Sequence, residues 1–90
     1  MNKTIITVVG KDTVGIIAKV CTYLAESRIN ILDISQTIVS GFFNMMMVAD
    51  MGEGMDSFET VRSELDELGK TIGVQIRLQR EEIFDMMHRV

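Results

Sequence analysis

Apolar residues recur along this 90-residue chain at two different spacings, and glycines separate the stretches that differ. Residues 4–9 are mostly β-branched, which is typical of a buried strand. Residues 14–25 carry apolar side chains three and four positions apart, which predicts a helix. Its expected buried stripe is Val14, Ile17, Ala18, Cys21, Leu24 and Ala25. Asp12 or Thr13 is placed to cap the first amides of that helix.

The middle of the chain reads as a β-hairpin. Residues 29–39 alternate with strand period. One side is expected to carry Leu32, Ile34 and Ile38, and the other Asp33, Ser35 and Thr37. Ser40 and Gly41 form a turn signal, and residues 42–49 are a second strand.

A second helix and a last strand follow. From Asp56 onward, one helical face carries Phe58, Val61, Leu65 and Leu68. Asp56 with Glu59 resembles a capping box, and Gly69 is the expected helix end. In residues 72–78, apolar and polar side chains alternate, as expected for a half-buried strand.

The order strand, helix, strand, strand, helix, strand predicts a ferredoxin-like α+β fold. Two right-handed crossovers then give a four-stranded antiparallel sheet with both helices on one face. We expect one domain over residues 1–90, with a core at 4–78. Residues 81–90 are a candidate third helix because apolar side chains recur at helical spacing, namely Ile83, Phe84, Met86, Met87 and Val90.

Charge and composition narrow the function classes. Nine basic against thirteen acidic residues give a net charge of −4, which disfavours binding to a phosphate backbone. The single cysteine, Cys21, excludes an internal disulfide and a multi-cysteine metal site, and we expect it in the core. No apolar run is long enough for a membrane span and the first residues carry no signal-peptide pattern, so we expect a cytoplasmic protein without membrane contact.

No catalytic constellation is visible in the sequence. His88 is the only histidine and lies near the end of the chain, where a solvated side chain is the simpler reading. The acids between Asp50 and Glu67 lack the spacing of a calcium loop, so we interpret them as a solvated surface. We therefore expect no enzyme activity, no metal and no cofactor.

The first loop, residues 10–17, is the strongest candidate for a binding site. It joins a strand end to a helix start, where free amides and the helix dipole favour a carboxylate. Asp12 can accept from an ammonium group, and an amino acid carries both charges. The alternative is structural: Asp12 caps the helix and Gly15 permits close helix packing.

The pattern Gly-x-Asp-x-x-Gly-Ile in this loop, followed by Asn-Ile-Leu-Asp-Ile from Asn30, resembles the ACT domain family. The chain is similar to stand-alone ACT proteins of bacteria and archaea without an assigned activity, and more loosely to ACT units of the glycine-cleavage repressor type. The resemblance implies a regulatory module that binds an amino acid. Its ligand-binding positions would be Asp12, Thr13, Val14, Gly15, Ile16 and Asn30. Val14 stands where the family often has proline, which makes the loop less rigid, and Asp12 where it often has asparagine.

Ligand sites of the family commonly form between two domains, so the resemblance implies a homodimer and a separate enzyme or regulator as partner. The sequence points to association independently: Met45–Val48 is apolar on both faces of a strand, while two helices cover only one face. Phe42, Met46 and Val48, or the alternate residues of that strand, would otherwise face water. The alternatives are that the C-terminal segment covers them, and that the dimer serves protein interaction without a ligand.

Overall fold

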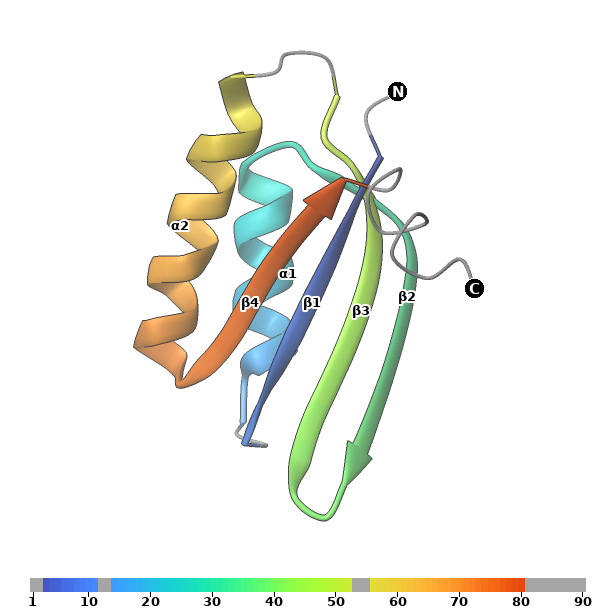
Figure 1. Ribbon diagram of the computed structural model, residues 1–90, viewed down its shortest axis with the longest axis vertical. Coiled ribbons are helices and arrows are strands. Elements are labelled where there is room, and N and C mark those ends of the chain that lie inside the picture. Colours follow the sequence, from blue (N-terminus) through green and yellow to red (C-terminus); the bar gives the residue numbers. More distant parts are fainter. Residues whose placement is uncertain (1–2, 12–13, 53–55, 81–90) are drawn as a thin grey trace.

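The computed structural model describes residues 3–11, 14–52 and 56–80. In chain order, the described residues form β1 (Lys3–Lys11), α1 (Ile16–Glu26), β2 (Asn30–Val39), β3 (Phe42–Asp50), α2 (Asp56–Ile72) and β4 (Val74–Arg80) (Figure 1). This is the predicted order, and the ferredoxin-like fold is confirmed.

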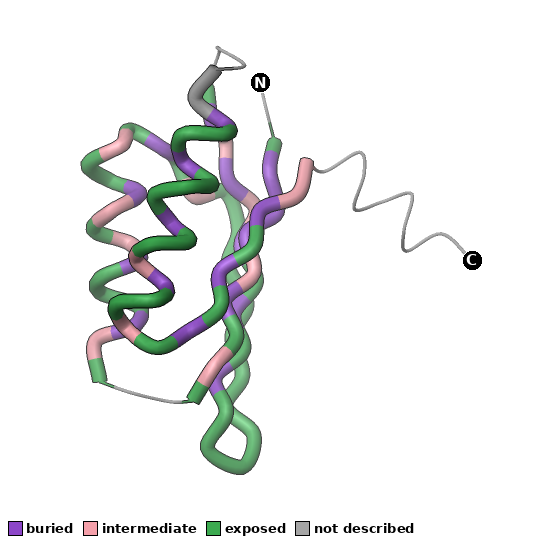
Figure 2. The backbone as a smooth tube through the Cα atoms, turned by 60° about the vertical axis from the view of Figure 1, so that its left-hand side comes forward, coloured by how far each residue is buried: buried purple, intermediate pink, exposed green. Residues whose placement is uncertain are grey.

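The four described strands form one antiparallel sheet in the order β2-β3-β1-β4. The strand β1 lies in the middle, where Ile6 is opposite both Met47 of β3 and Leu78 of β4. Both helices lie on the same side of this sheet (Figure 2). The strands β2 and β4 are therefore the two edges, and one face of the sheet has no helix from the described residues.

The core lies between the helices and the covered face of the sheet. The strands contribute alternate residues, among them Ile6, Val8, Phe43, Met45, Met47, Ile76 and Leu78. From α2, Phe58, Val61 and Leu65 are buried and Leu68 packs against them, which confirms the predicted face of this helix. The burial of these long side chains supplies the main stabilisation of such a small domain.

The predicted face of α1 was wrong except at Leu24. Its buried residues are Ile16, Val20 and Leu24, whereas Val14 is 101% exposed and precedes the helix. Ala18 and Ala25 are exposed, Ile17 is 37% exposed, and Cys21 is half-buried and outside the core cluster. Gly15 adopts a left-handed conformation with φ of 91° just before the helix, which a residue without a side chain reaches at no steric cost.

The sequence had suggested that α2 ends at Gly69, and this was wrong. The helix continues to Ile72, and the next residue, Gly73, has a φ of +79°, which suits the position after a helix C-terminus. A Cβ at Gly69 would lie 2.6 Å from the carbonyl oxygen of Val74, and one at Gly10 would lie 2.8 Å from Val74 Cγ1. Both glycines therefore permit a close approach to the start of β4.

The β2–β3 hairpin is confirmed. Ser40 and Gly41 both have positive φ, 52° and 81°, as in the two-residue turns that suit twisted hairpins. The predicted alternation along β2 fails at Leu32, because a β-bulge lies between Ile31 and Asp33. Ile34 and Ile38 do face the helix side, opposite Met47 and Phe43, but they are 45% and 55% exposed. The end of the hairpin extends beyond the helices, which accounts for the exposure of Ile38 (Figure 1). Ile34 lies in the row of the buried Met47 and Ile6, but on the edge strand β2.

Three local expectations lie outside the described residues. These are the capping of α1 by Asp12 or Thr13, the capping role of the Asp56 side chain, and a helix in residues 81–90. Glu59, the partner expected for Asp56, pairs with Arg62 at 3.5 Å between Oε1 and Nη1.

Candidate functional site

The predicted binding loop lies at one end of the sheet, between the last residue of β1 and the first turn of α1. Val14 is fully exposed there, and the carbonyl of Gly15 accepts a hydrogen bond from the Lys19 amide at 3.0 Å. Ile16 is 3% exposed and its side chain belongs to the core, so it can offer a ligand only its backbone. Asp12 and Thr13 lie outside the described residues.

The electrostatics of this loop come from the backbone. Gly15, the N-cap of α1, has no side chain to accept from the first amides, and no acidic residue stands in the first turn of this described helix. The amides at the start of a helix carry a partial positive charge and favour an anion. The described part of the loop therefore offers the kind of backbone charge that favours a carboxylate.

Asn30, the other predicted ligand residue, lies far from the loop within one chain. It begins β2 and is opposite Asp50, in the same row of the sheet as Lys3, whereas the loop follows Lys11. The 9-residue β1 separates these two ends by about 26 Å. Asn30 is exposed, and only a second copy of the chain can bring an Asn30 to this loop.

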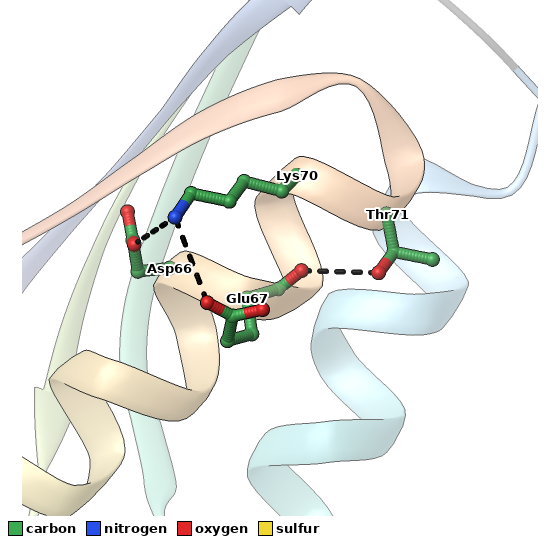
Figure 3. A network of polar contacts seen from close by, with 4 residues as sticks. All are labelled: Asp66, Glu67, Lys70 and Thr71. Carbon is green, nitrogen blue, oxygen red and sulfur yellow. Dashed lines mark hydrogen bonds and ion pairs between the residues drawn. The ribbon is translucent and has the colours of Figure 1, made fainter.

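A polar surface covers the outside of α2. Lys70 Nζ lies 3.3 Å from Asp66 Oδ2 and 3.5 Å from Glu67 Oε1, and the Thr71 hydroxyl donates to the Glu67 carbonyl at 3.0 Å (Figure 3). The hydrogen bond to Asp66 and its charge, followed by the charge of Glu67 and the hydrogen bond to it, raise the pKa of Lys70. Exposed pairs along a helix contribute little to stability. Within α2, the interpretation of the acidic residues as a solvated surface agrees with these contacts.

Sequence reasoning missed a groove of about 590 Å³ between α2 and β4. Its α2 side carries Glu59, Arg62, Ser63 and Asp66, and its other side is the edge strand from Gln75 to Gln79. The polar residues of α2 recur at three- and four-residue spacing, but nothing in that pattern shows which strand they approach. Among the described residues, no group of three His, Cys, Asp or Glu side chains is placed to hold a metal ion.

Comparison with known proteins decides the family. The sequence matches the family model of the ACT domain over residues 2–79. The chain belongs to the ACT domain family. A UPF0237 protein from Bifidobacterium longum (strain NCC 2705) is 60% identical over 90 residues, which is the whole of both chains.

Solved ACT structures agree with this fold. An ACT domain protein from Streptococcus pneumoniae superposes with a TM-score of 0.83 at 46% identity, over 92% of this chain and 93% of that one. A glycine cleavage system transcriptional repressor gives a TM-score of 0.77 at 23% identity, over 88% of this chain but 45% of that one. The resemblance to that repressor concerns the fold alone. No described helix of this ACT chain is long and apolar enough to cross a membrane.

Proposed function

We propose that this ACT chain is a stand-alone regulatory module that binds a small amino acid at a dimer interface and regulates a separate partner. ACT domains are generally regulatory modules that bind amino acids, and the family model covers residues 2–79. The observation that carries the proposal is the position of the two candidate elements: the first loop and Asn30 lie at opposite ends of one sheet.

The edge strand β2 supports dimerisation. It is 10 residues long, with Asp33 as its sole charged residue and neither lysine nor proline. Long edge strands without charge protection are prone to pair with another strand. If two copies join their β2 edges in antiparallel fashion, the Asn30 end of one copy lies at the loop end of the other. Such a dimer completes the site twice.

The arrangement assigns each group a task. The amides at the start of α1 hold the carboxylate of the ligand, Asp12 accepts from its ammonium group, and Asn30 of the second copy contributes an amide side chain. Because the site spans both copies, ligand binding stabilises one dimer geometry over others. A partner that recognises that geometry is then regulated in trans.

A ligand-free interaction module is the second candidate, favoured by a different observation. Val9, Phe42 and Met46 are 43%, 57% and 41% exposed on the strands that form the middle of the sheet. An exposed apolar surface of this kind serves protein contact without any small molecule.

Thermal unfolding of the full chain against each of the twenty amino acids separates the two candidates. A ligand present at about 100 times its Kd stabilises the folded state by about 2.7 kcal/mol. Asp12→Ala and Asn30→Ala should each abolish the shift while the unliganded Tm stays near that of the wild type. Gln75→Ala, an exposed change on the opposite edge strand β4, is the matched control and should retain the shift.

Absence of any shift in the wild-type chain overturns amino-acid binding and favours the interaction module. If Asp12→Ala instead lowers the unliganded Tm by several degrees, Asp12 acts as a helix cap and is not a ligand contact.

A further inference from the structure

The face of the sheet opposite the helices carries a strip of apolar side chains. The strand register places Ile5, Val9, Phe42, Met46 and Val48 on this face, and we call them the open-face strip. Ile5 is buried and Val48 is half-buried, whereas Met46 and Phe42 are 41% and 57% exposed. Among the described residues, no helix covers this face (Figure 2).

The C-terminal segment starts beside this strip. Arg80 ends β4 in the same row as Thr4 and Ala49, one residue beyond the row of Ile5 and Val48. The Arg80 guanidinium lies 4.9 Å from the centre of the Phe58 ring, a contact that ties the end of β4 to α2. The starting point of residues 81–90 is therefore held by the fold.

The sequence of this segment suits an apolar surface. Ile83, Met86, Met87 and Val90 recur at three- and four-residue spacing, which in a helix makes one stripe. A ten-residue helix is too short to persist alone in water, so it forms only where it docks. Methionine side chains adapt to irregular surfaces such as a sheet of mixed side chains.

We propose that residues 81–90 dock as a helix on the open-face strip of their own chain. Met46 is two strands across the sheet and about three residues along the strands from Arg80, which places the two residues about 14 Å apart. A ten-residue helix is about 15 Å long and can therefore reach Met46. Phe42 lies about 25 Å away by the same geometry. The helix therefore covers Ile5, Val48 and Met46 and leaves Phe42 outside.

The open face carries two cations, Lys3 and Arg77, that acidic side chains at the start of the segment can reach, beside the acidic Asp33 and Asp50. Glu81, Glu82 and Asp85 follow β4 closely in the sequence. Lys3 and Arg77 are both exposed on the open face. Lys3 lies near the end of the sheet where the segment begins, and Arg77 lies in the same row as Met46. Docking in the same chain also leaves the β2 edge available to a second copy, so the proposal does not depend on amino-acid binding.

Disulfide trapping in the full-length chain tests this proposal. In a Cys21→Ser background, Met46→Cys is combined with Met87→Cys, and the dilute protein is oxidised mildly. We expect both thiols to become unreactive and the protein to run at monomer mass on a non-reducing gel. The matched control is Phe42→Cys with Met87→Cys, in which both thiols should remain reactive because Phe42 is out of reach.

Free thiols in the Met46–Met87 pair overturn the proposal, as does a covalent dimer, which would show that the segment covers a second copy. Rapid crosslinking of the Phe42 control also overturns it, because the segment would then not be a helix fixed at Arg80. As an independent measurement, a chain ending at Arg80 should bind a hydrophobic dye several-fold more strongly than the full chain while keeping its circular dichroism.

Discussion

At the scale of single residues, the first position of β4 shows how little space this domain leaves. Val74 lies against both Gly10 of β1 and Gly69 of α2, and a methyl group at either glycine would come closer than 3.0 Å to it. At Gly10 the closest atom is a side-chain carbon, which has some freedom to move. At Gly69 it is a backbone carbonyl oxygen of a paired strand, which is fixed by its neighbours.

Gly69→Ala should therefore destabilise the fold, although alanine favours a helix by about 1 kcal/mol over glycine. The added methyl would lie 2.6 Å from the Val74 oxygen and would push α2 away from β4, for which we expect a net loss of about 1–3 kcal/mol in the free energy of unfolding. Urea denaturation measures this loss. Ser63→Ala, an exposed change in the same helix, is the control and should leave stability nearly unchanged. A Gly69→Ala variant as stable as the control would contradict the close approach.

At the scale of elements, the sequence is a good guide to whether a segment is a helix or a strand. It is a poorer guide to which face of that segment is buried. The strands and α2 were identified correctly as elements, from β-branched or alternating residues in the strands and from one helical stripe in α2, whereas the bulge at Leu32 and the end of α2 were not. In α1, apolar residues form two overlapping stripes, and periodicity alone does not tell which of them meets the sheet. The stripe that packs is Ile16, Val20 and Leu24. The candidate ligand positions in the first loop and at Asn30 stay predictions, and their separation to opposite ends of the sheet follows from strand direction.

A hydrogen bond between Tyr23 of α1 and Glu64 of α2 joins the two helices, and the Tyr23 hydroxyl can be titrated. The Tyr23 hydroxyl donates to Glu64 Oε1 at 2.5 Å, and the pKa of Tyr23 is raised to about 12, first by burial and then by this hydrogen bond. Since the folded-state pKa lies above the unfolded value near 10, the contact contributes its full stability below pH 10 and loses it as the pH rises towards 12.

Tyr23 is the sole tyrosine of the chain, so phenolate absorbance reports on it alone. We expect a midpoint well above 10 in the native protein, and a lower one in Glu64→Gln. The midpoint should remain raised in that variant because burial is the larger cause. In Tyr23→Phe, the free energy of unfolding should no longer show the decrease between pH 10 and pH 12 that ionisation of Tyr23 causes. A native midpoint at the ordinary tyrosine value would show that the helices are not joined in this way.

At the scale of the whole molecule, the two edges of the sheet differ. Arg77 and Arg80 lie on β4, and α2 with its polar groove runs beside that strand. By contrast, β2 has one acidic residue, and Ile34 and Ile38 are about half exposed on its helix side. The proposed dimer, which would complete the proposed amino-acid site, uses the less protected edge. The open face, covered by residues 81–90 in the proposed arrangement, is not required for it.

Ile34→Lys should therefore dissociate the dimer without unfolding the chain. The side chain is 45% exposed, so the monomer tolerates a lysine, whereas two lysines near a symmetric β2 pairing repel each other and the apolar contact is lost. The lost burial of an isoleucine alone corresponds to a dimer Kd about tenfold weaker or more. Light scattering across a concentration series measures the mass, and Gln75→Lys on β4 is the matched control. A dimer that persists in Ile34→Lys, or that dissociates in Gln75→Lys instead, would place the interface away from β2. Asn30 of one copy would then not lie at the first loop of the other, which would contradict the proposed site.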